Sequence, residues 1–321
     1  MKGKSADLRQ DEGIFPRTTK DWTLMQLIRR KSIAGCSVGR MAVGAAVWGQ
    51  GDKMMTSNDT SGTSPPSMAK CDRWPALESD AEVYTALLHT LLSPSSTPSD
   101  TRTPSCPFFF QDVFSLDDDY LGFVHGETLA LILAYDDRAL NPSQESPPDP
   151  QLPIAPIFIK QLPVLDNACG TIALLHAIIN TLPASTIPSS SLLAKFVSPI
   201  QAGETSFTSE SLGIRLDAHE GIRAAHCEHA AQGQSEQVQG DAVRYHFICL
   251  IPNPLSPYPA VLELDGLKAH PIIHVGGSEN GKKGETFLQM GAMVLKREFL
   301  AQFSNADETQ INVLALVRED P

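Results

Sequence analysis

The segment Gln161-Leu-Pro-Val-Leu-Asp-Asn-Ala-Cys169-Gly-Thr-Ile-Ala-Leu-Leu-His-Ala-Ile-Ile-Asn180 is the most informative part of this chain. It places Cys169 at the first turn of an otherwise apolar helix, with Gln161 a few residues before it. A helix N-terminus carries about half a positive charge and unpaired N–H groups, so it stabilises a thiolate. The same N–H groups can bind the oxyanion that forms when a thiolate attacks an acyl carbon. The segment therefore predicts a nucleophilic cysteine.

Two candidate partners for this cysteine lie downstream. Residues 245–251 alternate as a strand that carries His246, and the strand at 259–264 ends in Asp265. Strand ends that border a turn often present catalytic side chains. The residues thus predict Cys169 as nucleophile, His246 as general base and Asp265 as the carboxylate that orients the histidine.

Several motifs resemble those of the ubiquitin C-terminal hydrolases. The specific ones are Asn167-Ala-Cys-Gly-Thr-Ile172, Leu175-His-Ala177, His246-Phe-Ile248 and Glu263-Leu-Asp-Gly266; weaker ones are Arg73-Trp-Pro-Ala-Leu-Glu78, Asp112-Val-Phe-Ser-Leu-Asp117 and Gly233-Gln-Ser-Glu236. The resemblance covers roughly residues 72–320. Members of this family, peptidase family C12, are cysteine proteases that remove adducts from the C-terminal glycine of ubiquitin. The resemblance implies the short, free-standing type, because the chain ends soon after residues 311–317.

The resemblance also implies a role for each matching residue. Cys169, His246 and Asp265 match the family's triad, and Gln161 matches its oxyanion-hole glutamine, with the backbone N–H of Cys169 as second donor. The segment from Leu162 to Leu165 departs from the family pattern by two extra residues. Three alternatives remain open: a bulged loop, a displaced glutamine or a local error in the gene model. A misplaced donor would lower turnover by roughly 10²–10³.

The expected architecture is α+β, with a central, mainly antiparallel sheet surrounded by helices and a papain-like cysteine-protease core with a crossover loop at the active site. Residues 79–82 form a capping box and predict a helix with an apolar face. Residues 190–197 predict a second helix, and residues 198–243 predict a helix followed by a mobile loop, with the crossover loop near 203–240. Strands are expected at 108–114, 128–135, 157–160, 246–251, 260–264 and 311–317.

Charge divides the chain into two parts. Residues 1–71 hold 11 Lys/Arg and 6 Asp/Glu, a net charge of +5, whereas the remainder has a net charge of −17. The Ser/Thr/Pro-rich stretch at 56–67 cannot bury enough apolar surface to offset its ordering entropy. We therefore expect a disordered basic tail over 1–71 and a catalytic domain over 72–321. The acidic surface of the domain could complement a basic face of ubiquitin.

The chain carries no convincing secretory or transmembrane segment. The apolar stretch at 36–49 is 14 residues long and is interrupted by Arg40, which makes it too short to span a bilayer. The six cysteines lack a regular spacing, so a disulfide framework is not expected and a reducing compartment is. The prediction is a cytoplasmic protein, with the nucleus as a second location. Organelle targeting by the basic tail is the weaker alternative, because that tail contains acidic residues.

Other chemistry-bearing residues have simpler interpretations. His176, two turns into the Cys169 helix, is expected to be a packing residue rather than a second base. The set His219, His226, Cys227 and His229 matches no standard zinc spacing, so no metal is predicted. The glycine-rich residues 276–281 lack the Gly-Lys-Ser/Thr ending of a phosphate loop, which leaves a turn and no cofactor. The expected partner is ubiquitin or a close ubiquitin-like modifier, bound by a monomer, with no nucleic acid and no membrane.

The resulting hypothesis is a deubiquitinating thiol hydrolase that cleaves small or unstructured adducts from the C-terminal glycine of ubiquitin. One alternative is a catalytically impaired ubiquitin-binding protein of the same fold, which the altered spacing between Gln161 and Cys169 favours. A third keeps the Cys-His-Asp triad but assigns a different acyl substrate. Turnover of ubiquitin substrates separates the first two hypotheses. Comparison with small thioesters or short peptides as substrates separates the third hypothesis from both.

Overall fold

The computed structural model describes residues 73–94, 106–136, 156–201, 207–233, 245–253, 260–275, 285–302 and 311–319. All of them belong to the second of two compact units, residues 58–321. The basic tail and the glycine-rich turn expected at 276–281 lie outside the described residues.

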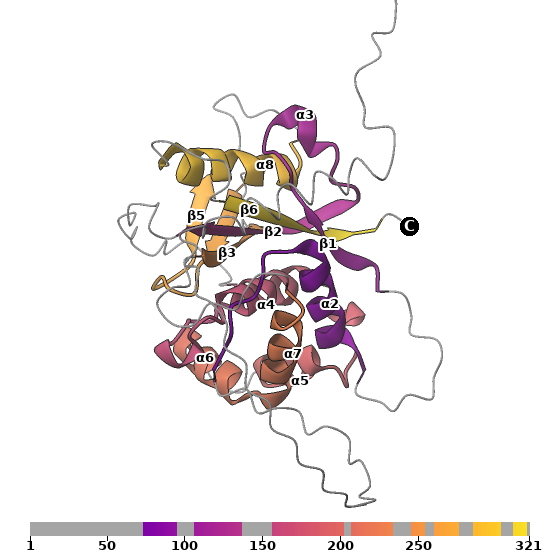
Figure 1. Cartoon of the computed structure of the whole chain (residues 1–321), viewed down its shortest axis with the longest axis vertical. Helices are drawn as coiled ribbons and strands as arrows, with labels where there is room; N and C mark the ends of the chain where they lie inside the picture. The colour runs from indigo at the N-terminus through magenta and orange to yellow at the C-terminus, as the bar shows by residue number, and fades with distance from the viewer. Residues whose placement is uncertain are drawn as a thin grey trace, which may run out of the picture. The chain divides into compact units, whose positions relative to one another are not determined.

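An antiparallel sheet forms the centre of this unit (Figure 1). Its strands follow the order β1-β6-β2-β3-β4-β5, and every neighbouring pair is antiparallel. The bounds are β1 Phe108–Asp112, β2 Glu127–Asp136, β3 Tyr245–Pro252, β4 Ala260–Leu264, β5 Ile272–Val275 and β6 Ile311–Arg318. The middle strands β6, β2 and β3 are apolar in near-continuous runs because both faces of the sheet are buried.

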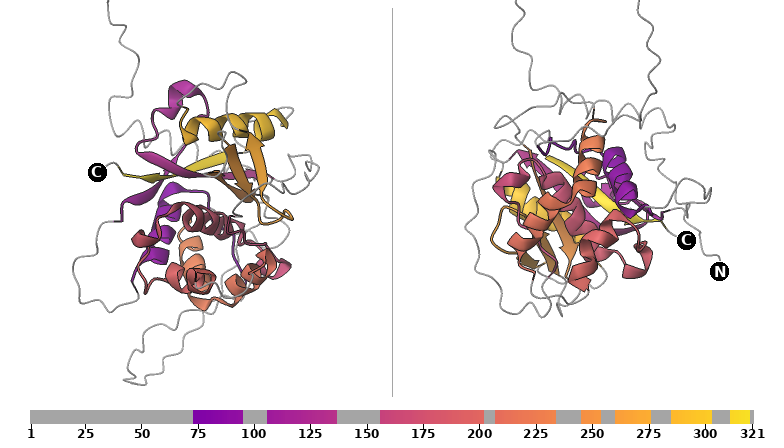
Figure 2. Two further views of the ribbon diagram at one scale, coloured as in Figure 1. Left: turned by 180° about the vertical axis from the view of Figure 1, so that it is seen from behind. Right: turned by 90° about the horizontal axis from the view of Figure 1, so that it is seen from below.

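Helices cover both faces of the sheet (Figures 1 and 2). One face carries α2 (Ala81–Leu92), α4 (Cys169–Thr181), α5 (Leu192–Gln201), α6 (Ser209–Ala218) and α7 (Glu220–Ala230). The other carries α3 (Asp118–Leu121) and α8 (Phe287–Val294), which continues as the π-turn η5 (Leu295–Phe299) and the 3-10 turn η6 (Leu300–Gln302). Each face has its own core: Phe247 and Cys249 of β3 face the larger helical layer, and Ile248 and Leu250 face α8. The α+β class expected from the sequence is confirmed.

Helix α4 is the central element of the larger layer. Every residue from Cys169 to Ile178 is buried, and the helix packs against β2 and β3. A helix that is apolar on all sides is stable only when it is enclosed on all sides. The sequence around Cys169 therefore places this thiol inside the molecule, between the sheet and the other helices.

The start of α2 differs from the expected capping box. The N-cap is Asp80, whose Oδ1 accepts hydrogen bonds from the backbone N–H of Glu82 at 2.8 Å and of Val83 at 3.1 Å. Ser79 is used otherwise: its carbonyl and hydroxyl oxygens accept hydrogen bonds from the side chain of Asn312 in β6. The expected apolar face of this helix is buried as predicted.

The strand expected at residues 157–160 does not form. The amides of this segment find partners outside any sheet: the N–H of Ile157 donates to Asn180, that of Ile159 to His176, and that of Lys160 to the carbonyl of Ser209. Because side chains of α4 satisfy the backbone here, the extended segment is held without a neighbouring strand.

The range expected to contain the crossover loop is also largely helical. Residues 209–230 form α6 and α7, so the prediction of a loop over the whole of 203–240 is wrong. Residues 202–206 and 234–244 on either side lie outside the described part of the chain. Gly213 allows α6 to approach the segment before Cys169, because a Cβ there would lie 2.4 Å from the carbonyl oxygen of Lys160.

Two further properties concern the helices and the cysteines of the described residues. None of the helices that the structure describes is long and apolar enough to cross a membrane. Among the described residues, Cys106, Cys169 and Cys249 are free thiols, and Cys227 in α7 is disulfide-bonded.

Candidate active site

Cys169 is the first residue of α4, and the helix begins without a side-chain cap. Its N-cap residue is Ala168, which offers no side-chain acceptor, whereas α2, α6 and α7 begin with caps from Asp80, Thr208 and His219. The first N–H groups of a helix have no partner within the helix. At α4 they therefore remain available for an anion beside the thiol of Cys169, which is 6% exposed.

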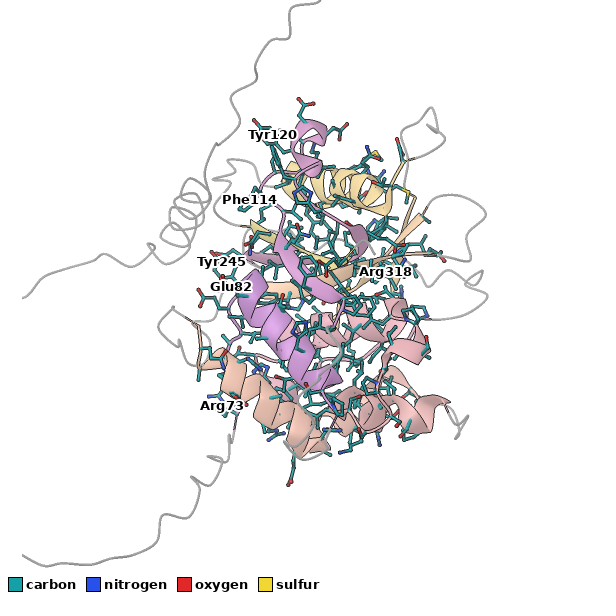
Figure 3. The ribbon with its side chains drawn as sticks, turned by 90° about the vertical axis from the view of Figure 1, so that its right-hand side faces the viewer. Arg73, Glu82, Phe114, Tyr120, Tyr245 and Arg318 are labelled. Carbon is teal, nitrogen blue, oxygen red and sulfur yellow. The ribbon has the colours of Figure 1, made fainter. Side chains whose placement is uncertain are left out.

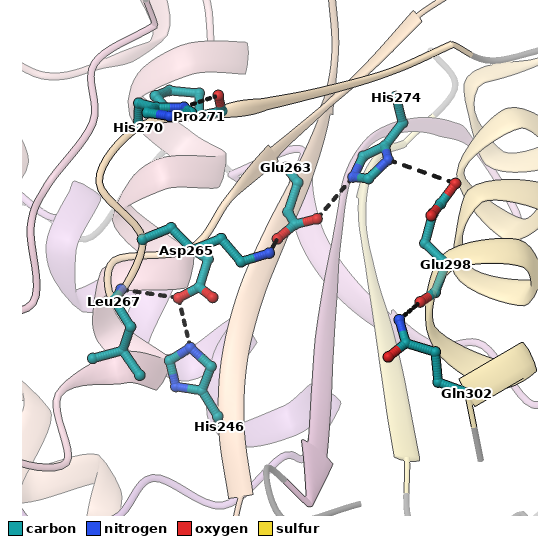
Figure 4. Close-up of polar contacts among 10 residues, drawn as sticks. His246, Glu263, Asp265, Leu267, His270, Pro271, His274, Glu298 and Gln302 are labelled. Atoms are coloured by element: carbon teal, nitrogen blue, oxygen red, sulfur yellow. Dashed lines mark hydrogen bonds and ion pairs between the residues drawn. The ribbon is translucent and has the colours of Figure 1, made fainter. Parts of the chain in front are cut away.

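His246 and Asp265 are brought together by two neighbouring strands. His246 is the second residue of β3, and Asp265 directly follows β4, which pairs with β3. The His246 Nε2 lies 2.7 Å from Asp265 Oδ1, and the backbone N–H of Leu267 donates to the same oxygen at 2.9 Å (Figure 4). Because Nε2 is engaged by the carboxylate, Nδ1 is the ring nitrogen left for the thiol.

The charges of this group reinforce one another. Burial lowers the pKa of His246. The hydrogen bond to Asp265 and the interaction with the Cys169 side chain outweigh this effect and raise the pKa to about 10. Burial raises the pKa of Asp265, but the hydrogen bond and charge of His246 hold it below its usual value. The arrangement therefore favours a charged imidazolium beside the Asp265 carboxylate, next to the Cys169 side chain.

Gln161 is held beside the Asp265 turn and in front of α4. Its backbone N–H donates to the carbonyl of Gly266 at 2.8 Å, and its side-chain Nε2 donates to the carbonyl of Asp166 at 2.7 Å. The residues between Gln161 and Cys169 form the 3-10 turn η2 (Pro163–Leu165), whose Leu165 is fully buried. The segment to which the two extra residues were assigned, Leu162 to Leu165, thus contains a short helical turn.

Lys160 has a role that was not predicted from the sequence: it connects the segment before Cys169 to the turn after Asp265. Its Nζ donates to the carbonyl oxygens of Leu267 at 2.6 Å and Lys268 at 2.7 Å. The segment that carries Gln161 is thereby tied to the turn that carries Asp265. A lysine next to a glutamine offers no sequence signal of this kind, because its partners are backbone carbonyls about a hundred residues away.

A second buried carboxylate lies on β4, two residues before Asp265. Glu263 is 2% exposed and bonds Lys268 Nζ at 2.5 Å and His274 Nε2 at 2.7 Å (Figure 4). Buried charges are tolerated when they are paired and hydrogen-bonded. These contacts join β4, the turn after Asp265 and β5, so Glu263 supports the hairpin that presents Asp265.

The remaining histidines near the site have structural partners. His176 Nε2 accepts a hydrogen bond from the N–H of Ile159 at 2.8 Å and its ring stacks on Phe158; burial lowers its pKa to about 4. His226 bonds Thr171 and the carbonyl of Pro75, and burial lowers its pKa to about 4 as well. Among the described residues, no three His, Cys, Asp or Glu side chains are grouped so that they could hold a metal ion.

Fold and site together define a class of protein. A thiol at an uncapped helix start faces an imidazole–carboxylate pair on an antiparallel sheet, which is the arrangement of a cysteine-type hydrolase with a papain-like core. More specifically, the chain belongs to the ubiquitin carboxyl-terminal hydrolases, because the model of the family "Ubiquitin carboxyl-terminal hydrolase, family 1" matches residues 74–298.

Individual relatives agree with this assignment. A ubiquitin carboxyl-terminal hydrolase of Drosophila melanogaster is 31% identical over 251 residues, which cover 76% of this chain and 96% of that protein. Ubiquitin carboxyl-terminal hydrolase isozyme L1 of Macaca fascicularis is 30% identical over 214 residues, 65% of this chain and 87% of that protein. The UCH37 catalytic domain of Trichinella spiralis, solved bound to ubiquitin vinyl methyl ester, has the same fold: the TM-score is 0.56 at 21% identity, covering 79% of this chain and 99% of that one.

Proposed function

We propose that this protein is a deubiquitinating thiol hydrolase that cleaves adducts from the C-terminal glycine of ubiquitin or of a close ubiquitin-like modifier. The observation that carries the proposal is the 2.7 Å contact between His246 and Asp265 next to the uncapped start of the Cys169 helix. The names of the relatives and the ubiquitin-based ligand of the structural neighbour support the choice of substrate.

The first half of the reaction forms a thioester. His246 takes the proton of Cys169, and Asp265 stabilises the imidazolium and fixes its orientation. The thiolate attacks the carbonyl carbon of ubiquitin's terminal glycine. The oxyanion accepts hydrogen bonds from Gln161 Nε2 and from the backbone N–H of Cys169. His246 then gives its proton to the leaving amine or thiol, and the bond to the adduct breaks.

The second half releases ubiquitin. His246, now neutral, takes a proton from a water molecule, which attacks the thioester carbon. The same donors hold the second oxyanion. As that intermediate collapses, the Cys169 thiolate leaves and regains its ion pair with His246, and ubiquitin departs with a free carboxyl group.

Access to the thiol limits the substrate. Cys169 and His246 are each 6% exposed, so only a slender chain end reaches them. A C-terminal glycine has no side chain and suits such a passage. We therefore assign small or unstructured leaving groups to this enzyme, and we expect rapid cleavage of ubiquitin carrying a short peptide and slow cleavage of folded diubiquitin.

The deciding experiment exposes the full chain and its Cys169→Ala variant to ubiquitin that bears a C-terminal electrophile. The expected result is a covalent adduct, seen by mass spectrometry, on the full chain and none on the variant. Ubiquitin binding without an adduct would favour the catalytically impaired binder. Absence of both, with turnover of small thioesters, would favour a hydrolase for another acyl substrate.

A further inference from the structure

The backbone at Asp166 is unusual, and it lies between Gln161 and Cys169, directly after the 3-10 turn η2. Asp166 has φ 44° and ψ −112°, and among the described residues it is the one non-glycine residue with positive φ. These angles are near those of the first central position of a type II′ turn, where glycine, asparagine and aspartate dominate. A residue remains in such a conformation only when its surroundings hold it there.

Arg73 supplies that restraint from 93 residues away in the sequence. Its Nε and Nη2 both reach Asp166 Oδ2, at 2.9 and 2.7 Å. Figure 3 shows Arg73 in the larger helical layer, on the opposite side of the sheet from Tyr120. Two guanidinium donors on one carboxylate oxygen fix the direction of the Asp166 side chain more tightly than a single contact does.

The carbonyl of Asp166 in turn orients the side chain of Gln161. It accepts a hydrogen bond from Nε2 at 2.7 Å, while the buried Oε1 of the same side chain has no partner. A carbonyl oxygen can only accept a hydrogen bond, so a flipped carboxamide would place the Gln161 Oε1 against the Asp166 carbonyl oxygen. The contact thus leaves the second N–H of Nε2 free to point at an oxyanion.

We propose that Arg73 and Asp166 are positioning residues that hold the Gln161 carboxamide with its N–H toward the reacting carbonyl. This inference rests on the proposed function, because it assigns a device to the oxyanion donor of that reaction. The ion pair between Arg73 and Asp166 thereby restrains the loop that carries Gln161 toward α4.

The test measures steady-state kinetics on ubiquitin with a fluorogenic C-terminal amide. Arg73→Ala and Asp166→Asn should each lower kcat about threefold to tenfold and leave KM within about twofold, since an exposed ion pair contributes little energy. The double variant should be no worse than either single one, because both remove the same contact. Lys296→Ala, which breaks the exposed ion pair with Asp117 near α8, is the matched control and should leave kcat unchanged.

A second comparison shows whether Arg73 acts through Gln161. Gln161→Ala should lower kcat by about 10²–10³. Adding Arg73→Ala to Gln161→Ala should change nothing further, and the rate of Cys169 alkylation by iodoacetamide should be equal in all variants. The proposal would be overturned if Arg73→Ala lowered kcat as strongly in the Gln161→Ala background as in the full chain. Slower alkylation of Cys169 in Arg73→Ala would overturn it as well.

A readout independent of turnover separates this inference from the proposed function. The Nε2 group of Gln161 should give a pair of side-chain amide NMR signals; the proton bonded to the Asp166 carbonyl should exchange slowly with solvent, and Arg73→Ala should accelerate its exchange. If ubiquitin substrates are not turned over, the proposed function fails and this signal still decides the inference. If this proton exchanges at the same rate in the full chain and in Arg73→Ala, the inference is overturned.

Discussion

His246 shows how opposing influences on one residue decide its chemistry. Burial alone would leave the imidazole neutral, yet the carboxylate of Asp265 and the side chain of Cys169 raise its pKa to about 10. The carboxylate is therefore more than an orienting group, because it favours the protonated form of the imidazole. Much of this was predictable, since Cys169, His246 and Asp265 each lie in a specific motif at the start of a helix or near the end of a strand.

We expect Asp265→Asn to lower kcat/KM by about 10²-fold or more. Without the negative charge, burial dominates and the pKa of His246 falls. The alkaline limb of the pH–rate profile for turnover should then move from near pH 10 toward neutrality.

The control for this prediction lies two residues earlier on the same strand. Glu263→Gln also removes a buried carboxylate that is bonded to a histidine, but that histidine is His274. The alkaline limb should stay in place in this variant. An equal displacement in both variants would mean that general negative charge, and not the contact with Asp265, sets the pKa of His246.

Among the structural elements, the sequence predicted the long and strongly patterned ones and missed those that depend on distant contacts. Helix α8 was not predicted, although Thr286 and Gln289 form a capping box at its start; Gly291 lies within the helix. That glycine lets the helix approach β2, since a Cβ would lie 2.4 Å from Leu131. The short strand β5 pairs only with β4 and lacks an independent signal. Residues 157–160 have strand-like character, but the amides of Ile157 and Ile159 bond to side chains of α4, which no local pattern can reveal.

Helix α4 therefore supports the active-site segment as well as supplying the thiol. We expect His176→Ala to lower the free energy of unfolding by about 2–4 kcal/mol, because it leaves the N–H of Ile159 without its partner and opens a cavity beside Phe158. Urea unfolding followed by circular dichroism measures this. Ile159 leads directly into Gln161, so kcat should fall as well.

A change at the end of the same helix provides the comparison. Thr181→Ala removes a hydroxyl that bonds only the carbonyl of Ala177 within α4, so it should alter the free energy of unfolding by less than about 0.5 kcal/mol. If both variants were equally stable, the contact from His176 to Ile159 would not be what holds the segment before Gln161.

At the scale of the whole molecule, three buried histidines link folding to pH: one lies in α4, one in α7 and one in β3. His176 and His226 have pKa values lowered to about 4, against about 6.5 when unfolded. Their contribution to stability is complete above pH 6.5 and is lost as pH falls from 6.5 toward 4. His246 has the opposite sign: with a pKa raised to about 10, its contribution is complete below pH 6.5 and is lost as pH rises toward 10.

The free energy of unfolding should therefore pass through a maximum near pH 6.5. Each histidine adds a slope of about 1.4 kcal/mol per pH unit within its own window. Urea midpoints between pH 4 and pH 10 measure the curve. His226→Gln should flatten the acidic side only, because its loss leaves His246 untouched, and Asp265→Asn should flatten the alkaline side only. If either variant flattened the other side of the curve, groups other than these histidines would control how the free energy of unfolding depends on pH.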